Sequence, residues 1–481
     1  MCENFLYFGD NLDILRDHIK DETIDLVYLD PPFKSNRNYN ILFQERNGSE
    51  SKAQIKAFED TWKWNDQAEM AYQDVVESGP ERLSKVMQAF RTFLGNNDMM
   101  AYLAMMAPRL VELHRVLKPT GSIYLHCDPT TSHYLKILMD AIFGPGNMQN
   151  EIIWGYRTGG VSKKHFARKH DTLLFYGKTE EPKFFPMQER IYYEKPFFTT
   201  KQDENGRYFA DVYIRDVWDD IKPVINVSSE RLGYPTQKPI SLLERIIRAS
   251  SEEGDIVLDP FCGCGTAVTA AQALNRRWIG IDITYLAIAL IKSRLRENFG
   301  DKIKYKVIGE PVTLPDAKAL AREDPYQFQW WAISKVIAQP VEKKKGADKG
   351  IDGRLYFHDE VSGTKVKTKQ IILQVKSGHV SSAHIRDLRG VIERENAEIG
   401  VLITLEEPSK AMKKEAISAG FYYSPGWQKR YPRIQILTVK DLLAGKRINY
   451  PGSREANVIY KKPPSLLKIS KQENRKLPYP Q

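Results

Sequence analysis

The sequence has little cysteine and no long apolar run, and each shortage excludes a class of protein. No apolar stretch reaches the roughly 20 residues that a transmembrane helix needs, and the N-terminus carries acids where a secretory signal carries lysines. The 481 residues contain no CxxC pair, so neither a disulfide framework nor a zinc-knuckle spacing can be built. The four cysteines are Cys2, Cys127, Cys262 and Cys264. We therefore expect a soluble protein of a reducing cytoplasm, with no membrane partner.

A glycine-rich stretch over 254–283 lacks the third glycine of a GxGxxG pattern, and no GK[ST] follows it. A P-loop is therefore excluded, and a pyrophosphate-bearing dinucleotide is a poor fit. What is present is a strand at 256–258, an acid, a glycine turn, a helix from about residue 266, and a second strand ending on Asp282. This order is typical of the front half of a Rossmann-like unit, in which a carboxylate ending the second strand accepts hydrogen bonds from ribose hydroxyls. The turn favours a cofactor with ribose and adenine but no phosphate.

The length and the charge indicate several domains and a polyanionic partner. At roughly 150 residues per domain, 481 residues suggest two or three units. The formal net charge is +10, and residues 446–481 hold nine basic and two acidic residues, a net +7. The end of the chain, 451–481, therefore reads as a flexible basic tail.

A second acid, Asp30, ends a buried strand expected at 24–29 and is followed by two prolines and an aromatic ring, in the sequence LDPPF. Asp-Pro alone is a common strand terminator, because proline lacks the N–H that a β-ladder needs. Its chemical interpretation depends on the glycine turn more than 200 residues downstream.

Three motifs resemble those of the amino-group DNA methyltransferases: LDPPF (29–33), YPTQKP (234–239) and VLDPFCGCGT (257–266). They occur in the permuted order of the β-type group, with the catalytic motif ahead of the cofactor turn. The resemblance runs from Gly9-Asp10 to about Arg296. It implies a Rossmann-like α/β fold, S-adenosylmethionine as cofactor and double-stranded DNA as substrate.

The same resemblance implies a role for each residue of the DPPF turn. Asp30 accepts a hydrogen bond from the exocyclic amine of the target base, and the Pro31 carbonyl accepts the other. Pro32 stiffens the turn, and Phe33 stacks on a base that has left the duplex. An acid at the first position is typical of adenine N6 as the target, whereas serine there is usual for cytosine N4.

The resemblance also assigns cofactor contacts. Asp282 holds the ribose, Asp10 lies near the adenine, and Lys238 falls in the segment that closes over the methionine carboxylate. The residues expected around the methionine part are Asp259, Phe261, Gly263, Gly265 and Thr266. Trp154 matches an aromatic position that often lines the base pocket, although a core tryptophan is an equal alternative. Basic residues mixed with aromatics over 155–230 predict a target-recognition insertion.

After about residue 310 the pattern changes to a hairpin. A short strand follows Asp352, a polar turn is expected over 358–369, and the next strand, IILQVKS, carries Gln374 and Lys376 on one face. This arrangement resembles the PD-(D/E)xK nuclease core in its Mrr-like version. It implies that Asp352 and Gln374 hold Mg²⁺ and that Lys376 activates the attacking water. A ligand carboxylate is replaced by Gln374, so a nuclease fold kept only for gripping DNA is the alternative.

The sequence as a whole predicts a methyltransferase domain (1–310), a smaller α/β restriction-endonuclease-like domain (311–450) and the basic tail. We expect a prokaryotic restriction-modification enzyme, an adenine-N6 DNA methyltransferase fused to a Mg²⁺-dependent endonuclease. The alternative is an orphan DNA methyltransferase, for adenine N6 or cytosine N4, whose C-terminal domain only binds DNA. A homodimer and a separate restriction or specificity subunit both stay open.

Overall fold

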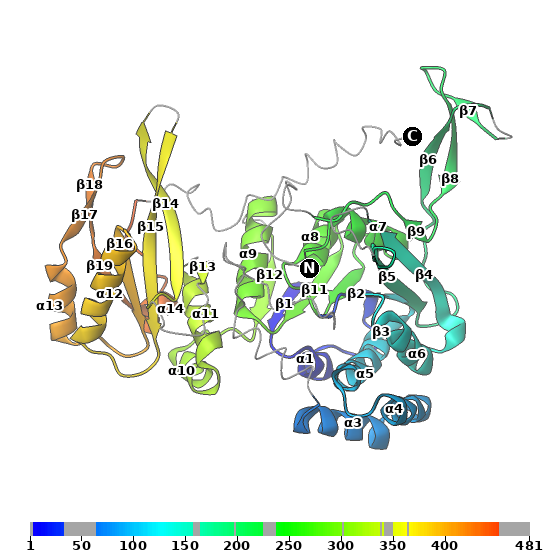
Figure 1. Cartoon of the computed structure of the whole chain (residues 1–481), viewed down its shortest axis with the longest axis horizontal. Coiled ribbons are helices and arrows are strands. Elements are labelled where there is room, and N and C mark those ends of the chain that lie inside the picture. The colour runs from blue at the N-terminus through cyan, green and yellow to red at the C-terminus, as the bar shows by residue number, and fades with distance from the viewer. Residues whose placement is uncertain are drawn as a thin grey trace.

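The computed structural model describes residues 3–32, 64–156, 164–196, 199–224, 237–300, 303–336, 339–340, 350–362 and 365–451. Two sheets dominate these residues, one of nine strands and one of five (Figure 1). Within the described ranges, no helix combines the length and the apolar character needed to cross a membrane.

The nine-stranded sheet is a Rossmann-like α/β sheet, as the sequence predicts. In spatial order its strands are β12 (Tyr305–Ile308), β1 (Asn4–Phe8), β11 (Arg277–Asp282), β10 (Ile256–Asp259), β2 (Ile24–Leu29), β3 (Leu117–Cys127), β5 (His170–Gly177), β4 (Met148–Gly155) and β9 (Val217–Trp218). The strands from β12 to β3 pair in parallel, and β5 is antiparallel to both its neighbours. The strands expected to end before Asp30 and on Asp282 are both confirmed.

Helices cover both faces of this sheet. One layer packs on β1, β2, β10 and β11 and consists of α7 (Ile240–Ser250), α8 (Thr266–Ala273) and α9 (Tyr285–Phe299). The other layer consists of α1 (Asn11–His18), α5 (Asp98–Val116) and α6 (Ser132–Phe143), with α3 (Asp66–Ser78) and α4 (Glu81–Leu94) packed outside it. The one-turn 3₁₀ helix η1 (Pro145–Asn147) leads into β4.

Strand β2 is buried along its whole length because helices cover both of its faces. Leu26 and Tyr28 face the α7–α8–α9 core, whereas Val27 and Leu29 face the α1–α5–α6 core. A continuous apolar run is typical of a central parallel strand. Since side chains alternate along a strand, Asp30 continues the Tyr28 side, towards α7.

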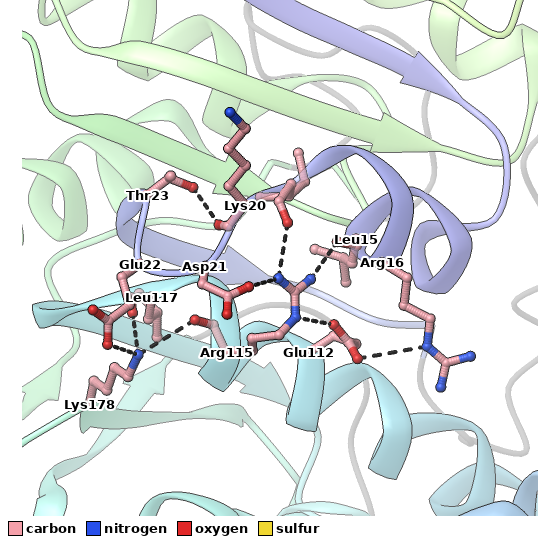
Figure 2. Close-up of polar contacts among 11 residues, drawn as sticks. Leu15, Arg16, Lys20, Asp21, Glu22, Thr23, Glu112, Arg115, Leu117 and Lys178 are labelled. Atoms are coloured by element: carbon pink, nitrogen blue, oxygen red, sulfur yellow. Dashed lines mark hydrogen bonds and ion pairs between the residues drawn. The ribbon is translucent and has the colours of Figure 1, made fainter.

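The chain enters β2 through a polar cluster at the opposite end from Asp30 (Figure 2). Arg115, at the end of α5, donates to the carbonyl oxygen of Leu15 at 2.6 Å and also pairs with Asp21. Lys178 pairs with Glu22 at 3.0 Å. These contacts fix the α1–β2 connection and thereby the start of the strand that carries Asp30.

A small antiparallel sheet extends away from the main sheet near β4 and β9 (Figure 1). It consists of β6 (Gln188–Tyr193), β7 (Lys201–Gln202) and β8 (Tyr208–Tyr213). The recognition insertion predicted over 155–230 was too broad, because β5 within it is a buried strand of the main sheet, paired with β3 and β4. Its polar start, in the sequence KHDTLLFY, hid an apolar strand.

The five-stranded sheet lies in the C-terminal third, in the spatial order β13 (Gln339–Pro340), β14 (Gly353–Ser362), β15 (Lys365–Lys376), β16 (Ile399–Thr404) and β19 (Ile434–Thr438). One face packs on α12 (Ser382–Arg394) and α13 (Lys410–Ser418); the other packs on α10 (Leu314–Glu323), α11 (Pro325–Lys335) and α14 (Val439–Leu443). A hairpin of β17 (Phe421–Ser424) and β18 (Lys429–Pro432) completes it.

The expected hairpin of Asp352 and Gln374 is confirmed, since β14 and β15 pair antiparallel with Gly353 opposite Leu373. The polar turn predicted over 358–369 is wrong, because β14 continues to Ser362 and β15 begins at Lys365. The β-branched residues of this stretch favour extended backbone in spite of its polar character.

The two sheets share packing at one junction. Tyr285, at the start of α9, belongs to the apolar core of the five-stranded sheet and stacks on Phe8 with 3.6 Å between ring centroids. Beside it, the carboxylate of Glu310 pairs with Lys292 of α9 at 3.0 Å and with Lys335 of α11 at 3.1 Å. The C-terminal elements therefore pack directly behind the end of β1.

Replacing Arg115 with methionine should lower the free energy of unfolding by about 2 kcal/mol, because the exchange leaves partly buried carbonyls without their charged donor. Urea unfolding followed by tryptophan fluorescence measures the change. Arg16→Met is the control, since the Arg16 side chain is 51% exposed and pairs only loosely, at 3.7 Å, with Glu112. Equal losses in the two variants would contradict the structural role of Arg115.

Candidate active site

Two of the predicted motifs meet where the sheet order changes direction. From β10 the chain moves through α8 to β11 on one side, whereas β2 leads to β3 on the other. Parallel α/β sheets bind ligands at the carboxyl ends of their strands at such a switch point. Because Leu258 pairs with Val27, Asp259 at the end of β10 lies close to Asp30, although 229 positions separate them in sequence.

The glycine turn after β10 contains two residues in the left-handed region. Gly265 adopts a φ of +73°, and a Cβ there would lie 2.7 Å from Cγ1 of Ile291. Gly263 has a φ of +46° and donates its N–H to Oδ2 of Asp282 at 2.9 Å. The turn and the end of the second strand are therefore held together, and α8 begins at Thr266 as predicted.

Three carboxylates surround this turn. Burial raises the pKa of Asp259 well above its usual range, and the negative charges of Asp30 and Asp282 raise it further. Burial likewise raises the pKa of Asp282 to about 6. Concentrated, poorly solvated negative charge makes the site suited to a cationic ligand.

Lys238 provides a cation within this group. Its Nζ lies 2.6 Å from Oδ2 of Asp30, and only 11% of the Lys238 side chain and 17% of the Asp30 side chain are exposed. Lys238 was predicted to close over the methionine carboxylate of the cofactor, but in the structure its partner is the proposed catalytic acid. Of the neighbouring residues, Pro31 and Pro32 are described, whereas Phe33 lies outside the described residues.

Asp10 occupies the adjoining end of β1. It caps α1 by accepting the N–H of Leu12 at 2.7 Å, and both its oxygens accept from Nη2 of Arg109, at 2.9 and 2.8 Å. The next residue, Asn11, donates to the carbonyl oxygen of Pro260 at 2.8 Å. Asp10 is thus joined to the cofactor turn through its neighbour, and its contact with adenine stays a prediction.

A buried hydrogen-bond chain beside Asp30 escaped the sequence analysis. Burial keeps the phenol of Tyr28 protonated by raising its pKa, and this phenol forms a hydrogen bond with Nδ1 of His126 at 3.0 Å. Nε2 of His126 then faces Oδ2 of Asp171 at 3.1 Å, and Tyr156 donates to Oδ1 of Asp171 at 3.2 Å. Burial acts to raise the pKa of Asp171, but the hydrogen bond and charge of His126, the charge of Lys238 and the hydrogen bond from Tyr156 together outweigh it, and the net shift is downward. Only their positions at strand ends could have indicated these residues.

Two further side chains support the site from behind. Arg294, 2% exposed, donates to the carbonyl oxygen of Cys264 at 3.0 Å and to Oγ1 of Thr266 at 3.1 Å, which braces the glycine turn. Trp154, also 2% exposed, donates to the carbonyl oxygen of Ile221 at 2.8 Å. The core alternative therefore describes Trp154 better than the base-pocket one. Phe261 is partly buried in the turn itself.

In the C-terminal sheet, two of the three predicted nuclease residues, Asp352 and Gln374, are hydrogen-bonded to the backbone. Oδ2 of Asp352 accepts the backbone N–H of Val375 at 2.7 Å, and Nε2 of Gln374 donates to the carbonyl oxygen of Gly350 at 2.5 Å. The exposed fractions of Asp352 and Gln374 are 3% and 4%. Lys376 follows on the same strand. Among the residues that the structure describes, no group of three or more histidine, cysteine or acidic side chains could hold a metal ion.

Comparison with known proteins decides the family. Residues 24–293, more than half of the chain, match the N6/N4 methyltransferase model, which is described as DNA methylase. The chain belongs to this DNA methylase family. Residues 331–444 match a second model, the NACHT-associated inactive restriction endonuclease 1. That description gives no support to the predicted nuclease activity.

Relatives of this DNA methylase include type II methyltransferases. M.HpaI of Haemophilus parainfluenzae is 34% identical over 245 residues, covering 50% of this chain and 74% of that protein. M.BamHI of Bacillus amyloliquefaciens is 28% identical over 311 residues, covering 63% of this chain and 59% of that protein. The DNA adenine methyltransferase YhdJ of Escherichia coli K12 is 32% identical over 180 residues, covering 36% of this chain and 60% of YhdJ. The chain thus spans between 59% and 74% of the lengths of these relatives.

Two solved structures align with this DNA methylase by fold alone. The cytosine-N4-specific PvuII DNA methyltransferase aligns with a TM-score of 0.38 and 17% identity, covering 61% of this chain and 86% of that one. The complex of M1.HpyAVI with SAM aligns with a TM-score of 0.33 and 18% identity, covering 60% of this chain and 98% of that one. The family assignment rests on the sequence match.

Asp282→Asn should change the pH dependence of stability of this DNA methylase. The carboxyl ionises near pH 4 in the unfolded chain but near pH 6 in the folded protein, so the folded state binds the proton more tightly. The contribution of Asp282 to stability therefore falls as pH rises from about 4 to 6. Asparagine does not ionise, so the stability of the variant relative to the parent should rise over that interval, by on the order of 1–3 kcal/mol.

Urea unfolding at a series of pH values measures this difference, with Asp74→Asn on the exposed side of α3 as the control. If the difference in unfolding free energy between Asp282→Asn and the parent stays constant from pH 4 to 7, the pKa of Asp282 is not raised in the folded protein.

Proposed function

We propose that the protein is a site-specific DNA methyltransferase that moves a methyl group from S-adenosylmethionine to N6 of adenine. The observation that carries the proposal is the placement of Asp30, which ends a buried strand beside the glycine turn and its two acids. Family membership gives the reaction class, and the arrangement of these residues supports the roles proposed for them.

The site fits S-adenosylmethionine by charge and by shape. When bound, this cofactor supplies an electrophilic methyl group on a positively charged sulfur. Asp259 and Asp282 concentrate negative charge where that cation would lie, and Asp282 would accept hydrogen bonds from the ribose hydroxyls. Gly265 lets the turn pack against Ile291, where a Cβ would lie 2.7 Å from Cγ1, and Gly263 joins the turn to Asp282 through its N–H. Phe261, Thr266 and Asp10 would complete the surroundings.

Asp30 makes the amino group of the base reactive. The lone pair of an exocyclic amine is delocalised into the ring, so the nitrogen is a poor nucleophile. A carboxylate that accepts one N–H, with the Pro31 carbonyl accepting the other, favours a tetrahedral nitrogen aimed at the methyl group. Proline at 31 and 32 holds these acceptors without adding a competing donor. Phe33 would stack on the extruded base.

The choice of adenine rests on the acid at position 30. The matched family covers both N6 and N4 methylation, and its model does not separate them. The aspartate of the DPPF turn favours adenine because serine is usual there in cytosine-N4 enzymes. The relative YhdJ, named as a DNA adenine methyltransferase, agrees with this choice.

The small sheet of β6, β7 and β8 suits DNA recognition. Arg190 lies over the ring of Phe209 at 3.8 Å and Arg207 over that of Tyr192 at 4.4 Å. Tyr213 on the same sheet is 66% exposed. Arg190 also pairs with Asp211 and Arg207 with Asp203. The surface that this sheet offers to nucleic acid is therefore one of stacked guanidinium and aromatic planes, and the sheet extends away from the main body (Figure 1).

For the C-terminal domain we propose DNA binding in preference to cleavage. One carboxylate and one amide make a weak Mg²⁺ site, and here the Asp352 carboxylate and the Gln374 amide already bond the backbone. The predicted endonuclease of a restriction-modification system, with Asp352 and Gln374 on Mg²⁺ and Lys376 at the water, stays a hypothesis that the experiment below separates from binding alone.

Asp30→Ala should slow methyl transfer by about a hundredfold or more without weakening cofactor binding, because it removes an acceptor worth on the order of 3 kcal/mol in the transition state. Transfer of tritiated methyl to genomic DNA from a methylase-free host measures activity, and calorimetry measures cofactor affinity. Asp74→Ala, on an exposed helix face, should match the parent. Transfer by Asp30→Ala at the parental rate would refute the assignment of Asp30.

The C-terminal domain should retain DNA without cutting it. Parent protein and Lys376→Ala are incubated with plasmid, with millimolar Mg²⁺ or Mn²⁺ and with chelator, on DNA grown with and without the methylase half. We expect equal background in all lanes and a mobility shift that persists in chelator. Metal-dependent cutting that Lys376→Ala removes would establish the nuclease instead.

A further inference from the structure

The ion pair between Lys238 and Asp30 joins two motifs that lie 208 positions apart in the sequence. Lys238 stands two residues before α7, and its Nζ donates to Oδ2 of Asp30 at 2.6 Å. Its charge also acts on Asp171 and Asp259: it contributes to the lowered pKa of Asp171 and partly opposes the raised pKa of Asp259. The Lys238 ammonium thus interacts with three carboxylates of the site.

This pair opposes the chemistry proposed for Asp30. The attacking nitrogen gains positive charge as its bond to the methyl group forms, and it needs a carboxylate whose negative charge is available. A carboxylate already bound to an ammonium at 2.6 Å is a weaker acceptor. The ammonium would also repel the developing charge. The ion pair between Lys238 and Asp30 must therefore break or weaken when the base reacts.

Lys238 can leave Asp30 only if another anion takes the place of that carboxylate. In the described part of the chain, Asp259 is influenced by the charges of Asp30, Asp282 and Lys238, and Asp171 by those of His126 and Lys238. The nearby Arg109 is bound to Asp10 through both carboxylate oxygens. An incoming anionic group would therefore compete with Asp30 for Lys238. The proposed cofactor carries one such group, the carboxylate of its amino-acid end.

We propose that Lys238 exchanges partners, from Asp30 in the free protein to the carboxylate of the cofactor in the complex. Cofactor binding thereby releases Asp30 to accept the amine of the target base. The exchange rests on the proposed function, because it assumes a cofactor with a carboxylate beside Asp30. Lys238 is a positioning residue in this scheme, and it makes the acceptor available only when a methyl donor is present.

Binding of a product-like ligand tests the exchange without relying on activity. S-adenosylhomocysteine carries the carboxylate but no sulfonium charge, and its decarboxylated form differs only by that carboxylate. Asp30→Asn frees Lys238, so it should tighten the binding of S-adenosylhomocysteine by about tenfold, the equivalent of one charged hydrogen bond. It should give no gain with the decarboxylated ligand, whose unchanged or weaker binding also shows that the variant is folded.

Lys238→Met closes the thermodynamic cycle. It should weaken the binding of S-adenosylhomocysteine but not of the decarboxylated ligand, and in its background Asp30→Asn should give less than about a twofold gain. Calorimetry on the full chain measures all eight affinities. Lys238→Gln serves as a second neutral variant if Lys238→Met does not fold.

The outcomes separate the two proposals. If the parent binds S-adenosylhomocysteine and Asp30→Asn leaves or weakens that affinity, the exchange is wrong while the proposed function stands. A tenfold gain that persists without Lys238 would also overturn it, because the effect would then be general electrostatics. If the parent binds neither ligand, the proposed function itself fails and the exchange fails with it.

Discussion

Parallel pairing of β2 with β10 is the constraint on which the site depends. It places the ends of two strands side by side, one carrying Asp30 and the other Asp259 with the glycine turn. Burying carboxylates so close together is costly, and the raised pKa values of Asp259 and Asp282 express that cost. A cation offsets it. In the free protein the cation next to Asp30 is Lys238, and a sulfonium ligand would add another.

The same constraint explains why the motif order can be permuted. The chain reaches β2 before β10, yet the sheet makes them neighbours regardless of sequence order. The supports on each side are local: Arg294 braces the glycine turn, and Arg115 fixes the connection that enters β2. The chemistry therefore depends on which strands are adjacent and not on which comes first.

Local patterns were enough to predict the strands and the turn of the site. Each of these structures is determined by a few neighbouring residues. One is the apolar run that ends before Asp30, and the other is the glycine turn between a strand that ends on an acid and an Ala-rich helix. The partner of Lys238 could not be predicted, because that contact depends on the approach of α7 to β2. The chain of Tyr28, His126 and Asp171 has the same origin, since it crosses three strands. Two further predictions were wrong because strand pairing decided the structure in spite of polar composition. Strand β5 pairs within the main sheet although it begins with polar residues, and β14 and β15 pair through a stretch that was predicted to be a turn.

In the C-terminal domain the sequence predicted that Asp352 and Gln374 lie on neighbouring strands, but it did not predict their hydrogen bonds to the backbone. Asp352 and Gln374 do face one another across a hairpin, but the bonds that each makes to the backbone are visible only in three dimensions. The match to a model described as inactive points the same way. This domain packs on the methylase half through Tyr285 and Glu310, next to the end of β1. A DNA-binding module in that place would hold substrate beside the site.

The central claim is that Asp30 and its neighbouring acids transfer a methyl group to adenine N6 in DNA. The most direct measurement is mass spectrometry of nucleosides from unmethylated DNA incubated with the protein and S-adenosylmethionine labelled with deuterium in its methyl group. The account predicts that the deuterium label appears in N6-methyl-2′-deoxyadenosine and that this product is absent from the Asp30→Ala reaction. Labelled N4-methylcytosine would contradict the choice of base, and an absence of label in DNA would contradict the account as a whole.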